Sequence, residues 1–188
     1  MSSYPGKLIT FEGIDGCGKS TQAEMLKEYL ENKGKKVYLT TEPSKDTCYK
    51  EEIRNIIFNN EINDAAKFFL FLADRAHHVK EVIFPKLESG HIVICDRFVH
   101  STFAYQHKII ELMQGYNIYT KERVIDHFVN FASLSIKPDL TLLIDIDPSV
   151  AKHRMELSEK HKHSYDTMDI NSKEEIRRIF IKICSLSK

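Results

Sequence analysis

Residues 13–20 read GIDGCGKS and combine three glycines, a lysine and a serine at a spacing that suits phosphate binding. They fit the pattern G-x-x-x-x-G-K-[ST], in which backbone N–H groups surround an anion, the lysine reaches the β and γ phosphates and the hydroxyl binds Mg²⁺. A glycine-rich turn that matches by chance is the alternative interpretation. The pattern predicts a nucleotide-binding loop formed by Gly13, Ile14, Asp15, Gly16, Cys17, Gly18, Lys19, Ser20 and Thr21.

A second group of polar residues follows an apolar run at 91–95, where Asp96 and Arg97 stand next to each other. In open α/β sheets, ligands gather at the carboxyl ends of the strands, so we expect Arg97 to share a crevice with Lys19. A guanidinium has five N–H donors and can bridge donor and acceptor phosphates, while Asp96 could hold Mg²⁺ through water. The alternative is a simple ion pair at a strand end.

Phe71 and Arg75 are four residues apart and therefore share one face of a predicted helix. An aromatic ring beside a guanidinium could hold a flat base, although Phe71 could equally pack in the core and Arg75 be a solvated charge. His77 and His78 follow on the same helix. Neighbouring side chains on a helix point about 100° apart, so we interpret these histidines as packing or interface residues rather than metal ligands.

The elements that must position these residues are indicated by apolar runs and helical periodicity. Strands are predicted over 7–11, 37–40, 91–95, 140–146 and 165–169, and helices over 20–33, 51–58, 64–87 and 173–184, with a bend near Pro85. Strands that alternate with helices predict an α/β fold with a central parallel sheet.

Composition indicates one domain of ordinary size, because the chain has 188 residues and 42% of them are apolar. Lysine plus arginine and aspartate plus glutamate each number 27, so no net field favours nucleic acid or an anionic membrane. The four cysteines lack the spacing of a metal site or a disulfide framework. We find no apolar leader and no membrane span, and therefore expect a soluble cytoplasmic protein with reduced thiols.

Three blocks of sequence together resemble one family: FEGIDGCGKSTQ, then LFLADRAHHVKEVIFPKLESGHIVICDRFVHSTFAYQ, then KPDLTLLIDIDPSVAKHR. They resemble thymidylate kinases, which transfer the γ-phosphate of ATP to dTMP, over about residues 7–154. The resemblance implies a three-layer P-loop NTPase fold of the nucleoside monophosphate kinase type. It also implies ATP and Mg²⁺ as cofactors and a homodimer formed through the long helical stretch 64–87, although a buried core helix would look alike.

The resemblance also implies roles in phosphate transfer. Lys19 and Arg97 would stabilise the transferred group, and Asp15 would accept a hydrogen bond from the sugar 3′-hydroxyl. These three are the catalytic candidates. Arg54 resembles the family arginine that grips the acceptor phosphate, and Glu42 matches the acid of the family's Arg-Glu-Pro.

For the acceptor base, the resemblance implies that Phe71 stacks on thymine and that Arg75 donates to a thymine carbonyl. Tyr105 stands where a tyrosine crowds the sugar C2′ and disfavours ribose. Thr102 and Gln106 occupy positions that line the base pocket.

Two departures from the family pattern concern phosphate binding. Members with glycine at the position of Gly16, where others have arginine, usually carry arginines in a mobile lid. Only 155–164 is left for that lid here, and it offers Lys160, His161, Lys162 and His163 but no arginine. We expect a single domain with this shortened lid, unless the segment is only a solvated charged loop. Thr41 also replaces an arginine of the family.

Two other functions remain open at this stage. One is a kinase for another deoxynucleotide, because acceptor choice in this fold depends on a few side chains. The other is a phosphate-loop protein that binds nucleotide with reduced catalysis, because the lid lacks arginine.

Overall fold

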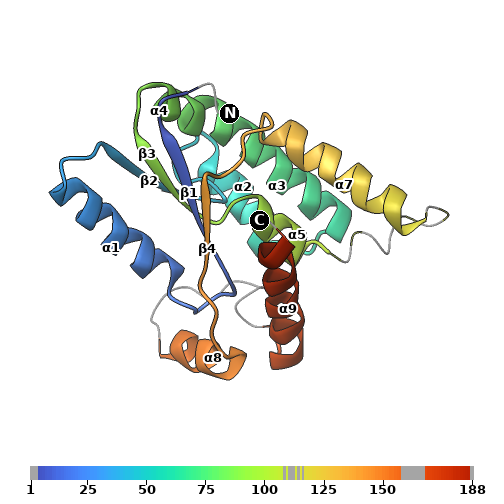
Figure 1. Ribbon diagram of the computed structural model, residues 1–188. Coiled ribbons are helices and arrows are strands. Elements are labelled where there is room, and N and C mark those ends of the chain that lie inside the picture. The colour runs from blue at the N-terminus through green and yellow to red at the C-terminus, as the bar shows by residue number, and fades with distance from the viewer. Residues whose placement is uncertain are drawn as a thin grey trace.

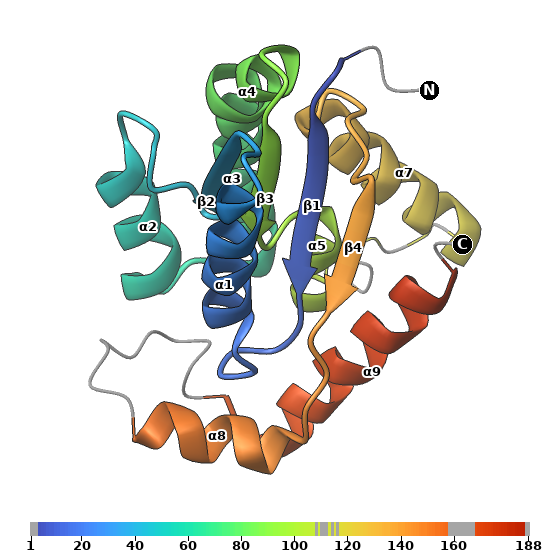
Figure 2. The same ribbon diagram turned by 60° about the vertical axis from the view of Figure 1, so that its left-hand side comes forward.

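A four-stranded parallel sheet forms the centre of the molecule, with strand order β2-β3-β1-β4. The computed structural model describes residues 4–107, 109, 113, 115, 117–157 and 168–186. The strands are β1 (Lys7–Glu12), β2 (Val37–Thr41), β3 (Ile92–Asp96) and β4 (Leu140–Leu143). Because all four strands run the same way, their carboxyl ends meet at one edge, which is where Figure 2 places their arrowheads.

Helices cover both faces of this sheet (Figure 1). α1 (Lys19–Asn32) lies on one face, and a continuous helical segment lies on the other. That segment comprises α3 (Asp64–His78), η1 (Val79–Ile83) and α4 (Phe84–Glu88). The remaining helices are α2 (Lys50–Asn59), α5 (Val99–Tyr105), α7 (Ile118–Ala132), α8 (Pro148–Glu156) and α9 (Ile170–Leu186).

Alternation along the strands explains the two layers of helices. Leu8, Val93 and Cys95 pack against the helical segment η1–α4, whereas Phe11 and Ile94 pack against α1. Successive side chains of a strand point to opposite faces, and a parallel sheet covered on both faces buries both sets. The predicted α/β fold with a central parallel sheet is therefore confirmed.

The predicted helix over 64–87 is helical throughout but changes its hydrogen bonding before Pro85. Residues 79–83 are π-helical, and the N–H of Phe84 bonds to the carbonyl of Val79, five residues back. Proline has no N–H to continue the α-helical ladder, so the ladder is interrupted close to the expected position.

Two predicted strands differ from the structure. β4 ends at Leu143 instead of residue 146, because its partner β1 ends at Glu12, which pairs with Leu143. For the predicted strand 165–169, residues 165–167 lie outside the described residues. Met168 and Asp169 are not in a strand. Instead, the Asp169 carboxylate accepts a hydrogen bond from the Ser172 backbone N–H at 3.0 Å, at the start of α9.

The sequence reasoning made no prediction for α5, α7 and α8. α5 is short and follows a loop of unusual geometry, whereas α7 begins with a recognisable cap, since Asn117 accepts from the N–H of Thr120. In the described part of the chain, no helix is both long enough and apolar enough to cross a bilayer.

Candidate active site

A cavity of about 800 Å³ opens at the carboxyl ends of the strands. It brings together every residue predicted for the acceptor nucleotide: Asp15, Glu42, Arg54, Phe71, Arg75, Arg97, Thr102, Tyr105 and Gln106. Part of the predicted phosphate loop lines the same cavity, namely Asp15, Gly16, Gly18, Lys19, Ser20 and Thr21. The cavity is thus shared by the phosphate loop and by the residues that the family resemblance assigned to the acceptor nucleotide.

The phosphate loop joins β1 to α1 and contains three glycines with positive φ: Gly13 at 141°, Gly16 at 84° and Gly18 at 101°. These angles are ones that only glycine adopts readily, so the loop can turn successive backbone N–H groups toward one point. Ile14 and Cys17 differ from the rest of the loop. Their side chains are buried in a cluster with Ile176 and Phe180 of α9 and do not line the cavity.

Helix α8 packs tightly on this loop. A Cβ atom on Gly16 would lie 2.5 Å from the carbonyl oxygen of Ala151 and 2.7 Å from Cγ of Met155. Both distances are far below van der Waals contact, so glycine is required at position 16 for space as well as for its φ.

Arg97 occupies an unusual backbone conformation for an arginine, with φ at 75°. A non-glycine residue there costs about 1–3 kcal/mol, and such strain is concentrated at functional sites. The conformation sends the guanidinium back toward the phosphate loop, where Nη1 donates to the carbonyl of Gly13 and to Ser101 Oγ, both at 3.1 Å. Arg97 also pairs with Asp15.

Asp15 lies between two cations and a phenol. Burial opposes ionisation of its carboxyl group, but Arg97 and Lys19 outweigh burial and lower the pKa of Asp15 to about 2. The Tyr105 hydroxyl donates to the second carboxylate oxygen at 2.8 Å. Lys19 donates to the carbonyl of Ile14 at 2.8 Å, and burial together with the nearby Arg97 lowers its pKa.

Ser20 and Asp96, the predicted metal residues, meet at the start of α1. The Ser20 hydroxyl donates to Asp96 Oδ2 at 2.5 Å. Asp96 Oδ1 is buried and has no hydrogen-bond partner among the described residues. A hydroxyl beside a buried carboxylate oxygen fits Mg²⁺, which binds through one or two protein groups and completes its shell with phosphates and water. Within the described residues no cluster of three metal-binding side chains exists.

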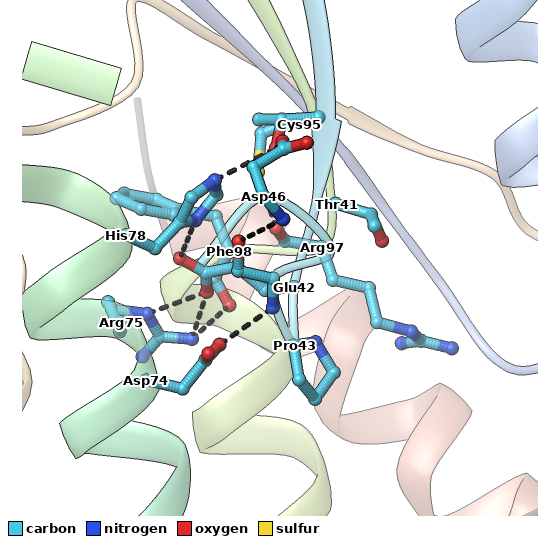
Figure 3. Close-up of polar contacts among 12 residues, drawn as sticks. Thr41, Glu42, Pro43, Asp46, Asp74, Arg75, His78, Cys95, Arg97 and Phe98 are labelled. Atoms are coloured by element: carbon cyan, nitrogen blue, oxygen red, sulfur yellow. Dashed lines mark hydrogen bonds and ion pairs between the residues drawn. The ribbon is translucent and has the colours of Figure 1, made fainter. Parts of the chain in front are cut away.

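At the other end of the cavity, Arg75 is almost fully buried and held by three acceptors, of which Figure 3 shows Glu42 and Phe98. Its Nε and Nη2 reach Glu42 Oε2 at 2.8 and 2.7 Å, Nη1 donates to Thr102 Oγ1 at 2.7 Å, and Nη2 donates to the carbonyl of Phe98 at 3.1 Å. Burial favours the neutral acid at Glu42, but Arg75 and His78 lower its pKa, so Glu42 is a carboxylate. The guanidinium is therefore fixed in one orientation.

Phe71 is partly exposed and lines the cavity, so it is available to a planar ligand. Phe58 of α2 meets it edge to face, with ring centroids 6.3 Å apart. Arg54 lies over the Phe58 ring and donates to the carbonyl of Pro43 at 3.2 Å. Thr41, which stands where the family has arginine, donates to the carbonyl of Asp96 at 3.0 Å.

Sequence reasoning assigned no role in the site to several residues of this region, among them Lys45, Arg154 and His78. Lys45 lines the cavity from the loop after β2, and Arg154 of α8 donates to the carbonyl of Cys17 at 3.4 Å. His78, interpreted as a packing or interface residue, is fully buried against Glu42. Lys45 could have been suggested by its position close to Glu42 in the sequence. Arg154 and His78 could not, because they reach the site through tertiary packing. Residues 158–164 of the predicted lid lie outside the described residues.

Comparisons with known proteins agree with this geometry. The family model described as thymidylate kinase matches residues 11–188. The chain belongs to the thymidylate kinase family. The thymidylate kinase of Wolbachia pipientis wMel is 37% identical over 177 residues, which cover 93% of this chain and 83% of the relative.

Two further relatives come from other organisms. The thymidylate kinase of Thermosipho melanesiensis is 39% identical, with 96% of this chain and 85% of the relative covered. The probable thymidylate kinase of Pyrococcus abyssi is 33% identical, with 97% and 85% covered. Family membership carries with it the P-loop NTPase fold, which the parallel sheet and the loop after β1 display.

Proposed function

We propose that this chain transfers the γ-phosphate of ATP to dTMP and forms dTDP. The observation that carries the proposal is the single cavity in which the phosphate loop and the Phe71–Arg75 pair face a common space. Family membership supports the same activity. Two nucleotides bound in one cavity can be aligned for in-line transfer, and positioning accounts for much of the rate in such reactions.

At the phosphate end, residues of the loop bind the β and γ phosphates of ATP. Lys19 and Arg97 neutralise the charge of the group in flight, and the Arg97 fork can contact donor and acceptor phosphates together. Mg²⁺ would be held by Ser20 and by Asp96 directly or through water, and when bound it neutralises phosphate charge. No general base is needed, because the acceptor phosphate is already an anion. Arg154 adds a cation beside the loop.

At the acceptor end, Phe71 stacks on thymine and Arg75 donates to a thymine carbonyl. Base stacking on an aromatic side chain contributes about 1–3 kcal/mol. Asp15 and Tyr105 face the sugar, while Thr102 and Gln106 line the base pocket. Arg54 and Lys45 supply the positive charge for the acceptor phosphate, which compensates for a threonine at position 41.

We also propose that the chain is a single domain, acts in the cytoplasm and forms a homodimer. The four cysteines are all free, which supports a reducing compartment. Phe69 of α3 and Phe131 of α7 are 52% and 83% exposed on neighbouring helices, which supports an interface there. Sedimentation equilibrium would contradict the homodimer if it gave the mass of one chain.

A substrate panel tests the activity. Purified protein with Mg²⁺-ATP is offered dTMP, dUMP, dCMP and dGMP, and formation of each diphosphate is measured. We expect dTMP to be used best and dUMP next, because both bases carry the carbonyl to which Arg75 donates. Preference for dCMP or dGMP would overturn the base-pocket assignment. Tight ATP binding without any diphosphate product would instead support a nucleotide-binding protein with reduced catalysis.

A further inference from the structure

His78 is completely buried at the last turn of α3 and makes two polar contacts. Its Nδ1 lies 3.3 Å from Glu42 Oε1, and its Nε2 lies 2.8 Å from Thr40 Oγ1. Figure 3 shows Glu42 between His78 on one side and Arg75 on the other. One carboxylate thus connects the histidine to the guanidinium that faces the cavity.

Counting protons in these contacts determines what the ring donates. The Thr40 hydroxyl has one hydrogen, and it goes to Asp46 Oδ2 at 2.8 Å, because a carboxylate only accepts. Toward His78, the Thr40 oxygen must therefore accept, and Nε2 must carry a hydrogen. Glu42 is also a carboxylate, so Nδ1 must donate to it as well. A ring that donates from both nitrogens is an imidazolium.

The charges around the ring favour the imidazolium form of His78. Glu42 and Asp46 bring two negative charges from the end of β2 and the loop that follows it. Arg75 brings one positive charge from the same helix as His78, and a positive His78 balances the group. Asp74 also faces this region, and its Oδ2 accepts from the backbone N–H of Ser44 at 2.8 Å. Burial raises the pKa of Asp74.

We propose that His78 is a positioning residue for base recognition: its two N–H groups hold Glu42, and Glu42 holds Arg75 toward the acceptor base. Through Thr40 and Asp46, the same ring ties α3 to the loop that carries Lys45 and precedes Arg54. The inference rests on the proposed function, because that function gives Arg75 its role. A residue needed only to fill space would not require two donors.

Nuclear magnetic resonance of the wild-type chain tests the protonation directly. With ¹⁵N-labelled histidine, the two ring nitrogens of His78 should both show the shift of protonated nitrogen near neutral pH. The resonance is assigned by its loss in His78→Gln. This measurement does not depend on activity or on a correctly chosen substrate.

Steady-state kinetics tests the positioning role. His78→Phe keeps an aromatic ring of similar size but removes both donors, and it should raise KM for dTMP by about tenfold, the effect of one lost hydrogen bond to a charged group. We expect kcat within about twofold of wild type and an unchanged KM for ATP, since uniform binding is lost rather than transition-state binding. His78→Gln, which keeps one donor for Glu42, should recover part of the loss.

His77→Phe is the matched control, because it makes the same change one residue earlier. The His77 ring lies 4.9 Å from the ring of Tyr49, a contact that phenylalanine can keep, and both KM values should stay at wild type. An unprotonated ring nitrogen on His78, or a folded His78→Phe with the wild-type KM for dTMP, would overturn this inference. A wild-type chain that does not phosphorylate dTMP would overturn the proposed function instead.

Discussion

The phosphate end of the cavity is organised by backbone, whereas the base end is organised by side chains. Between Gly13 and Ser20, three glycine φ angles and one helix start create the anion site within eight consecutive residues. At the base end, Arg75 is fixed by Glu42, which follows β2, by Thr102 from α5 and by the carbonyl of Phe98 just before α5. These partners come from two separate parts of the chain, and Arg75 itself belongs to a third.

This difference predicts how each end responds to substitution. A backbone cradle survives the loss of a side chain, so changes at the phosphate end should act mainly on the reaction step, except at Asp15, whose carboxylate is itself stabilised by Arg97 and Lys19. A buried network of charges is coupled, so a change at the base end should weaken acceptor binding and also reduce stability.

Arg97→Ala should have the largest effect, lowering kcat by about 10³-fold, the scale found when a transition-state arginine is removed. KM for dTMP should change much less. Arg97→Lys keeps the charge without the fork and should be intermediate. Arg177→Ala removes an arginine that pairs with Asp145 outside the cavity, so as a control it should keep wild-type turnover. Retained activity in Arg97→Ala would remove Arg97 from the mechanism.

Arg75→Ala should lower kcat/KM for dTMP by about 100-fold, because it removes a base contact and leaves the buried Glu42 without its guanidinium partner. KM for ATP should stay constant. Thr102→Val removes one acceptor from Arg75 and serves as a milder variant if Arg75→Ala does not fold. Equal losses for ATP and dTMP would contradict the assignment of Arg75 to the acceptor end.

Asp15→Asn tests stability against pH. Since the pKa of Asp15 is lowered to about 2 in the folded chain, its stabilising effect is complete above the unfolded pKa near 4 and is lost as pH falls through about 2. The shift corresponds to about 2 kcal/mol of unfolding free energy at neutral pH. Urea unfolding at pH 7 and at pH 2.5 should show a larger difference for wild type than for Asp15→Asn. Parallel curves would show that Asp15 is not stabilised by its cations.

Lys45→Ala should have the smallest effect. An exposed lysine acts on the acceptor phosphate as a screened point charge, so KM for dTMP should rise by about threefold, and less at high salt. Lys50→Ala is the matched control, because Lys50 is also exposed and nearby in sequence but does not line the cavity. An equal rise in both variants would point to general charge rather than to a contact from Lys45.

The phosphate end could be predicted from sequence because its information is local. A run of residues 13–20 specifies the turn, and β1, α1 and β3 follow from simple periodicity. All acceptor residues also line the cavity, but their roles came from resemblance and stay predictions. His78 and Arg154 could not be found in this way, because their partners lie 36 and 137 residues away and depend on how helices pack.

Strand ends were also beyond local reasoning. Ile144 and Ile146 continue the apolar pattern of the strand before them, yet β4 stops at Leu143 because β1 has turned away at Gly13. A strand needs a neighbour as well as a suitable composition. The missed helix α5 is short and starts without a side-chain cap. Helix α8 is also short, but its start has a local signal, because Asp147 accepts from the N–H of Ser149 and Pro148 is the first helical residue.

The contact between Gly16 and α8 has a consequence for redesign of the enzyme. An arginine at position 16, as in other family members, would place its Cβ atom too close to the Ala151 carbonyl oxygen and to the Met155 side chain. Helix α8 would have to move away from the loop before such an arginine could bind phosphate. In this chain, a cation for the donor phosphates placed on the helix itself, where Arg154 already stands, would avoid this clash.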